Sequence, residues 1–172
     1  MKVSFKYPCG IIVQCQTTKF KGITTSRLQM INGCIQYCVQ PQCAKNKTDV
    51  VPDSLFLDEQ YLSPVKTKIG GPQVVDFKFK LGDKVRNTLS NMVGIVRYCI
   101  QDQNGCIRYD AIGGMVKDTG KPLLIRGFEQ EYEKVSDGIN KSEELKADKE
   151  YLAIPRKATG GPSRRSSMYN RD

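Results

Sequence analysis

The chain contains one stretch of sequence twice, and this repeat constrains the fold more than any other feature. Residues 5–37 align with residues 77–109 without a gap, at an offset of 72, and twelve of the 33 positions are identical. Unrelated sequences of ordinary composition would share about two or three of these positions. Farther on, Glu59-Gln60 matches Glu129-Gln130 at an offset of 70. Because loops tolerate a shift of two residues, we expect a duplicated structural unit.

The run Asn32-Gly33-Cys34-Ile35 recurs as Asn104-Gly105-Cys106-Ile107. An Asn-Gly pair before alternating apolar and polar residues is a strong signal for a tight β-hairpin. Such a two-residue turn needs positive φ at both central residues, which Asn tolerates and Gly adopts freely. We therefore expect turns at Asn32-Gly33 and Asn104-Gly105. Cys34 and Cys106 are then expected to face the core at equivalent strand positions.

Each unit is predicted to consist of short strands rich in β-branched and apolar residues. The strands are expected at 10–15, 22–27, 34–40 and 55–57 of the first unit, and at 82–86, 94–98 and after 105 of the second. Gly22 and Gly94 lie inside strand patterns, which predicts a bulge or a sharp bend at each. Four or five strands in about 60 residues are too few for a sandwich but can close a small barrel.

This pattern predicts a mainly β protein of two tandem small barrels, at 1–66 and 76–136. The connecting linker, 67–75, contains Gly70-Gly71-Pro72 and is expected to lack regular structure. It shows no phosphate-binding pattern, and neither does Gly113-Gly114.

The composition changes over 137–172, where we expect a short helix and a flexible basic tail. Asn140 with Glu143 three residues later is typical of a capping box that opens a charged helix. Pro155 ends it, and the remainder has the composition of a disordered segment.

A resemblance to known proteins follows from three segments of the second unit. They are Phe77-Lys78-Phe79-Lys80-Leu81-Gly82-Asp83-Lys84-Val85, Gly94-Ile95-Val96 and Asn104-Gly105-Cys106. Together they resemble a group of small tailed-phage proteins of unassigned role. The first two are also similar to the KOW-type SH3-like barrels of ribosomal and transcription-elongation proteins. The resemblance implies SH3-like barrels in both units and brings no catalytic residues. The first unit departs from the KOW pattern, with Gly10-Ile11-Ile12-Val13 in place of Gly82-Asp83-Lys84-Val85.

Composition favours a non-enzymatic protein. The chain has no histidine, which excludes Ser-His and Cys-His nucleophilic pairs and histidine acid–base catalysis. Four thiols that could bind zinc, those of Cys15, Cys34, Cys38 and Cys43, lack the Cys-x-x-Cys spacing of a structural zinc site. We therefore expect no metal and no cofactor. The sequence contains no run of about 18 apolar residues, so we expect no transmembrane helix. The N-terminal residues lack the pattern of a signal peptide.

The formal net charge of +9 is spread over the whole chain, which is typical of diffuse attraction to an acidic partner. Basic residues beside aromatic ones are the candidates for contacting nucleic acid or an acidic protein surface. These candidates are Lys19, Lys21, Arg27, Arg97 and Arg108, with Arg164 and Arg165 in the tail.

The sequence leaves three functions open. The first is a phage structural or accessory protein that binds other virion proteins and is located in the virion. The second is a KOW-like RNA- or DNA-binding module, and the third is an inhibitor of a host factor. Both of these would act in the host cytoplasm during infection. The sequence does not define the oligomeric state.

Overall fold

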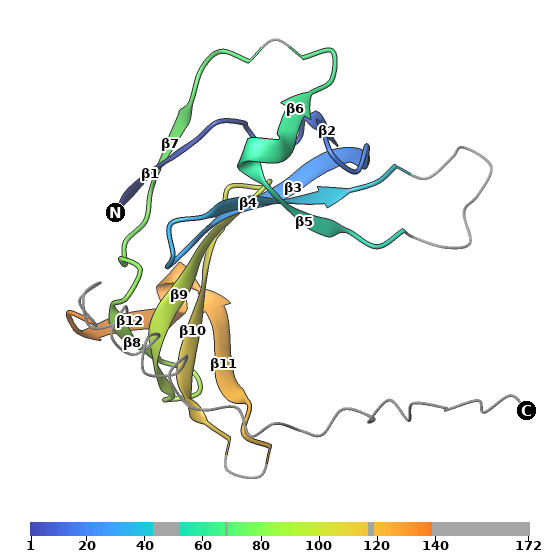
Figure 1. The fold of residues 1–172 in the computed structure, drawn as a ribbon. Coiled ribbons are helices and arrows are strands. Elements are labelled where there is room, and N and C mark those ends of the chain that lie inside the picture. The colour runs from blue at the N-terminus through green and yellow to red at the C-terminus, as the bar shows by residue number, and fades with distance from the viewer. Residues whose placement is uncertain (43–51, 68, 117–118, 139–172) are drawn as a thin grey trace, which may run out of the picture. The chain divides into compact units, whose positions relative to one another are not determined.

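The structure is a computed structural model that describes residues 1–42, 52–67, 69–116 and 119–138 (Figure 1). The described part is mainly β, as the strand patterns predict, and contains two single-turn 3₁₀ segments but no α-helix. No helix in these residues has the length and apolar character of a membrane span. The helix and the tail predicted from residue 140 onward lie outside the described residues, and so do Arg164 and Arg165.

The two repeats have the same strand order. The first repeat consists of β2 (Ile12–Cys15), β3 (Lys21–Met30), β4 (Ile35–Gln40), β5 (Leu55–Asp58), η1 (Glu59–Tyr61) and β6 (Leu62–Pro64). The second repeat consists of β8 (Lys84–Asn87), β9 (Val93–Asp102), β10 (Ile107–Met115), β11 (Pro122–Phe128), η2 (Glu129–Glu131) and β12 (Tyr132–Ser136). Pairing is antiparallel throughout, in the order β6-β2-β3-β4-β5 and the equivalent β12-β8-β9-β10-β11.

A further pair of strands joins the two repeats. β1 (Lys2–Phe5) pairs antiparallel with β7 (Gln73–Asp76), and Val3 lies opposite Val75. The prediction that the linker 67–75 lacks regular structure was therefore wrong for its C-terminal end. Gln73-Val74-Val75 has two β-branched residues, and its backbone forms a ladder with a distant strand that no local pattern indicates.

The central strands of the repeats also pair with each other, so that β3 and β9 join the two sheets into one. Leu28 lies opposite Ile100, and these residues occupy the same position in the two copies. Val3 and Val75 are likewise equivalent. Residues that pair with their own equivalents mark a pseudo-two-fold axis, the symmetry of an isologous dimer. The chain thus holds two copies of one unit as a homodimer would hold two subunits, and Met1–Ile139 form one compact unit.

The two repeats share one hydrophobic core. Phe5 and Phe77, which are equivalent residues, are both almost fully buried, and their rings meet edge to face at 6.4 Å. Phe5 also packs against Tyr37, and Phe77 against Tyr109, at similar separations. Edge-to-face contacts at these distances are favourable aromatic geometry.

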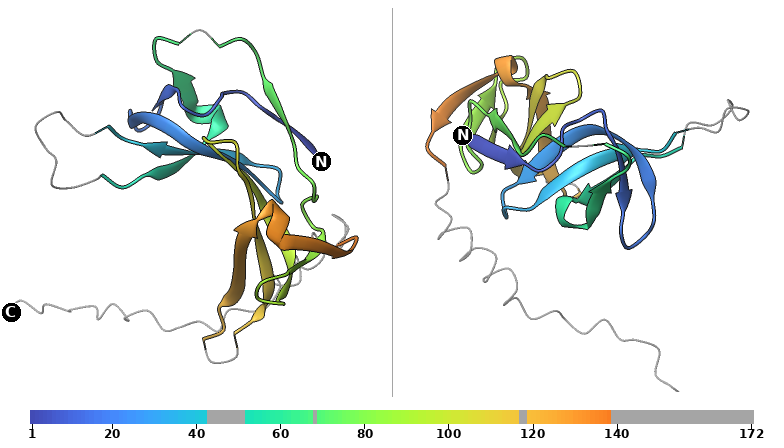
Figure 2. Two further views of the ribbon diagram at one scale, coloured as in Figure 1. Left: turned by 180° about the vertical axis from the view of Figure 1, so that it is seen from behind. Right: turned by 90° about the horizontal axis from the view of Figure 1, so that it is seen from above.

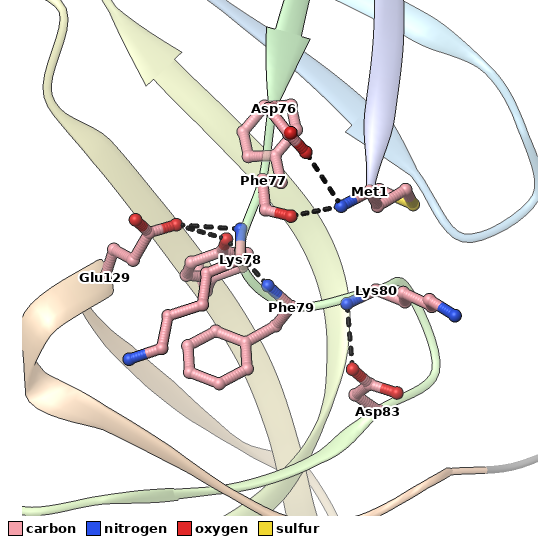
Figure 3. Close-up of polar contacts among 9 residues, drawn as sticks. Met1, Asp76, Phe77, Lys78, Phe79, Lys80, Asp83 and Glu129 are labelled. Atoms are coloured by element: carbon pink, nitrogen blue, oxygen red, sulfur yellow. Dashed lines mark hydrogen bonds and ion pairs between the residues drawn. The ribbon is translucent and has the colours of Figure 1, made fainter.

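Each core tyrosine is fixed by a hydrogen-bond arrangement that occurs in both copies. The Tyr109 hydroxyl accepts a bond from the Phe79 backbone N–H at 3.2 Å and donates to Glu129 Oε2 at 2.7 Å. The same Glu129 oxygen accepts from the Lys78 backbone N–H, as Figure 3 shows. In the first repeat Tyr37 and Glu59 bind the backbone at residues 6 and 7 in the same way. Glu59 and Glu129 therefore begin the two 3₁₀ turns, and their carboxylates anchor the start of each repeat.

The chain reverses direction at both Asn-Gly pairs, but the turn differs from the one expected. Gly33 and Gly105 have φ of 90° and 88°, whereas neither asparagine has positive φ. The Gly33 N–H bonds to the Met30 carbonyl, and the Asn32 side chain accepts from the Cys34 N–H at 3.0 Å. This is the longer hairpin loop in which only the glycine is left-handed.

The longer loop also changes the position of the cysteines. Cys34 and Cys106 come before the first residues of β4 and β10, and both are exposed. The prediction that they face the core was therefore wrong. Tyr37 and Tyr109, three positions later in each copy, face the core instead.

Gly22 and Gly94 mark a close approach of strands rather than a bulge. A Cβ atom at Gly22 would lie 2.3 Å from the Gln40 carbonyl oxygen, and one at Gly94 would lie 3.0 Å from the Ile112 backbone. The bulged residues are Thr25 and Arg97, three positions further along β3 and β9. Glycine is required here because β4 and β10 leave no room for a side chain.

Candidate protein-binding groove

An open groove of about 570 Å³ lies on one face of the joined sheet. Its lining comes from six strands that are consecutive neighbours, β5-β4-β3-β9-β10-β11, so the groove crosses from one repeat to the other. Figure 2 shows from two sides how β3 and β9 connect these strands. The lining residues are Leu28, Met30, Gln36, Phe56, Tyr98, Ile100, Asp110, Ile112, Lys121, Pro122, Leu124 and Arg126.

The floor of the groove is apolar and lies on the pseudo-two-fold axis. Leu28 and Ile100 are only 5% and 7% exposed, yet neither belongs to the shared core cluster. Side chains of alternate residues point to opposite faces of a strand, so β3 and β9 carry apolar residues on both faces. Phe56 and Leu124, at the two sides, are 56% and 43% exposed. A contiguous exposed apolar surface of this kind is typical of an interaction site.

A row of four cross-strand neighbours runs along one side of the floor. Met30 on β3 lies opposite Tyr98, Tyr98 lies opposite Asp110, and Asp110 lies opposite Arg126 on β11. Asp110 and Arg126 form an ion pair, in which Arg126 Nε donates to Oδ2 of Asp110 at 3.2 Å. Directly opposed residues of opposite charge stabilise a sheet modestly.

The second carboxylate oxygen of Asp110 is the unusual feature of the groove. Asp110 is 7% exposed, and its Oδ1 is buried without a hydrogen-bond partner among the described residues. Burial raises the pKa of the Asp110 carboxyl, while the positive charges of Arg126 and Arg108 oppose that rise. A buried acceptor without a donor costs about 1–3 kcal/mol, which a ligand with a suitable donor would recover.

The groove is also where the two copies differ. The equivalents of Tyr98, Asp110 and Arg126 in the first repeat are Ser26, Cys38 and Phe56. These three form the matching row on the other side of the axis, because Phe56 lies opposite Cys38 and Cys38 opposite Ser26. The Asp110–Arg126 ion pair therefore has no counterpart at the equivalent positions of the first repeat.

The structure does not gather the basic residues singled out in the sequence into one surface. Arg27 is buried, with 5% exposure, and its guanidinium donates to Gln101 Oε1 and to the Tyr7 carbonyl. It also lies 4.7 Å above the Phe5 ring. Arg27 is therefore a core residue that links the repeats, and it has no free face for a phosphate.

The remaining candidates are dispersed. Arg108 pairs with Asp102 through bonds of 2.6 and 2.7 Å, a two-pronged geometry that occupies its guanidinium. Arg97 is half-buried at the β9 bulge, and Lys19 and Lys21 are exposed around the start of β3. None of these residues lines the groove.

The cysteines considered as zinc ligands are not brought together. Cys15 is buried, Cys34 is exposed and Cys38 is half-buried, while Cys43 lies outside the described residues. Within the described ranges, no three Cys, Asp or Glu side chains form a group that could hold a metal ion.

Sequence analysis did not identify the groove residues. The strand signals at 55–57 and 94–98 contain Phe56 and Tyr98, but a strand pattern does not say which face meets the core of a joined sheet. The signal that could have found them is the divergence between the copies at Tyr98, Asp110 and Arg126, whose equivalents are Ser26, Cys38 and Phe56. No family model, curated protein or solved structure matches the chain.

Proposed function

We propose that this chain is a non-enzymatic binding protein of a bacteriophage, a structural or accessory component that docks a neighbouring virion protein in the groove. The observation that carries the proposal is an open apolar groove across both repeats with a buried, unpaired carboxylate oxygen in its wall. Concave apolar sites with a few placed polar groups are the usual form of a binding site. The phage assignment is supported by the sequence resemblance of the second repeat.

We also propose that each repeat is an SH3-like barrel. Support comes from the strand order, in which the first strand pairs with both the second and the fifth. The fifth strand therefore returns to the beginning of the repeat, as the closure of a small barrel requires.

A role in the particle is tested on purified virions of the phage that encodes the chain. We expect mass spectrometry to find the protein at a fixed ratio to the major structural proteins. A photoreactive amino acid at Phe56 should cross-link it to a second virion protein. The matched control is Leu89, which is 79% exposed and does not line the groove. Absence from particles would exclude a virion role, and a cross-link to a host protein would favour the inhibitor hypothesis.

A nucleic-acid-binding role is a weaker alternative. Neutralising Arg27, Arg97 and Arg108 together would be its direct test, but Arg27 is buried and Arg108 is already paired. Loss of binding in such a variant could reflect damage to the core. Salt-dependent binding of the unmodified protein to RNA or DNA is the better measurement.

A further inference from the structure

Asp110 gives the groove a specific chemical preference. Its Oδ1 is buried and unpaired, while its Oδ2 already accepts from Arg126. A carboxylate oxygen accepts hydrogen bonds only, so the group that completes this site must be a donor. A bound partner that donates a hydrogen bond to Oδ1 would offset the free-energy cost of burying this oxygen without a partner. The protein would therefore bind such a partner more tightly than one that lacks a donor.

The charges around Asp110 indicate that this donor is neutral. Among the described residues, the groove lining contains one carboxylate, that of Asp110, and two cations, Lys121 and Arg126. Arg108 also acts on Asp110 through its positive charge. A further cation brought to Oδ1 would meet these positive groups, whereas a backbone N–H, a hydroxyl or an amide would not.

Arg126 and Lys121 favour an acidic group of the partner at a position more exposed than Asp110. The Arg126 side chain is 68% exposed, and its guanidinium has N–H groups beyond the Nε that Asp110 uses. Lys121 is exposed on the same side of the groove. A carboxylate on the partner could therefore pair with Arg126 in the geometry that arginine favours.

The floor requires an apolar group between these polar contacts. Leu28 and Ile100 form its centre, and Phe56, Ile112 and Leu124 stand around them. Because Leu28 and Ile100 are almost fully buried, most of the apolar surface that a partner side chain would remove from water here belongs to Phe56 and Leu124, and such burial is the main source of affinity in these sites.

We infer that the groove binds an acidic polypeptide segment that places an apolar side chain over Leu28 and Ile100, a neutral N–H or O–H donor on Asp110 Oδ1, and a carboxylate near Arg126. This inference rests on the proposed function, because it takes the occupant to be a polypeptide. The protein's formal charge of +9 adds a long-range attraction for the same class of partner.

The test is selection of a displayed library of random peptides on the full-length protein, followed by affinity measurements with the enriched peptides. We expect these peptides to combine acidic residues with a large apolar residue. Asp110→Asn should weaken their binding about tenfold or more. The substitution removes the carboxylate, and the amide NH₂ group of Asn can then face the partner's N–H or O–H, with which it forms no hydrogen bond. Arg126→Gln should weaken binding and reduce its dependence on salt.

Matched controls separate these effects from general damage. Asp53→Asn makes the same change at an exposed aspartate outside the groove, and Arg86→Gln removes an exposed arginine that also lies outside it. Both should bind the selected peptides as the unmodified protein does. Enrichment of basic peptides, or equal binding by the Asp110→Asn variant and its control, would overturn the inference and leave the docking function intact. Failure to select any peptide that competes for the groove would overturn the docking function itself.

Discussion

The Asp110 carboxyl group is buried, with Arg126 on one oxygen and no hydrogen-bond partner for the other among the described residues. Burial raises its pKa above the ordinary value of 3.8, so the folded protein binds this proton more tightly than the unfolded chain does. Stability from this group is therefore greatest at low pH and is lost as the pH rises through the folded-state pKa. We expect Asp110→Asn to gain stability relative to the unmodified protein as the pH is raised.

The measurement is urea unfolding of both proteins at about pH 4 and about pH 7. The exposed residue Asp53 provides the control, since Asp53→Asn removes a carboxylate from the surface. A stability difference for Asp110→Asn that stays constant with pH, or that moves in the opposite direction, would contradict the account of its burial.

At the scale of elements, the approach of β3 to β4 depends on Gly22. A methyl group there would lie 2.3 Å from the Gln40 carbonyl oxygen, which is rigid backbone. We expect Gly22→Ala to destabilise the protein by about 1–3 kcal/mol, as overpacking does. Gly94→Ala should cost less, because its nearest contact is at 3.0 Å. Gly70→Ala is the control, since nothing lies within 4 Å of that position. Equal unfolding free energies for all three variants would show that β3 and β4, and β9 and β10, can move apart to fit a methyl group without loss of stability.

The buried tyrosines make the stability of the strands that carry them depend on pH in the alkaline range. Burial raises the pKa of Tyr132 to about 12 and raises the pKa values of Tyr37 and Tyr109 further. These groups stabilise the fold fully below the unfolded pKa of 10.0, and that contribution is lost as the pH rises through the folded-state values. We expect the free energy of unfolding to fall steeply above about pH 10.

Unfolding measured together with tyrosinate absorbance checks this expectation. Tyr132→Phe should lessen the dependence on pH, whereas Tyr61→Phe, at a position that is 47% exposed, should leave it unchanged. Ionisation of all tyrosines near their ordinary pKa without unfolding would contradict the buried hydrogen-bond arrangement.

Local patterns predicted most of the strands within each repeat, because β-branched runs and Asn-Gly turns are local signals. They failed where distant segments meet. β1 pairs with β7 although Val3 and Val75 are 72 positions apart in the sequence, and the alternation of Lys2-Val3-Ser4-Phe5 does not identify the partner strand. The pairing of β3 with β9 could not be predicted from local patterns. β2 is short and pairs only with the beginning of β3, so the rest of that edge of β3 is open to β9. The groove depends on that pairing, so its residues could not be assigned from sequence either.

At the scale of the whole molecule, the two repeats are joined by β3–β9, by β1–β7 and by one aromatic core. Phe5 touches both Phe77 and Tyr37, and Arg27 reaches Gln101 of the other copy. Neither repeat can therefore lose its structure without exposing apolar surface of the other. We expect a single cooperative unfolding transition for residues 1–138, as small single domains show, instead of one transition for each repeat.

Calorimetry and hydrogen exchange on the full chain test this expectation. The calorimetric and van't Hoff enthalpies should agree, and amides of β4 and β10 should exchange with the same free energy of opening. Phe5→Ala should cost about 3–5 kcal/mol and weaken protection equally in both repeats, because its ring lies at their common centre. Phe20→Ala, at a partly buried position of the first repeat, should cost less. Two resolved transitions, or loss of protection in the first repeat alone, would show that the copies fold independently and that the groove can open along the pseudo-two-fold axis.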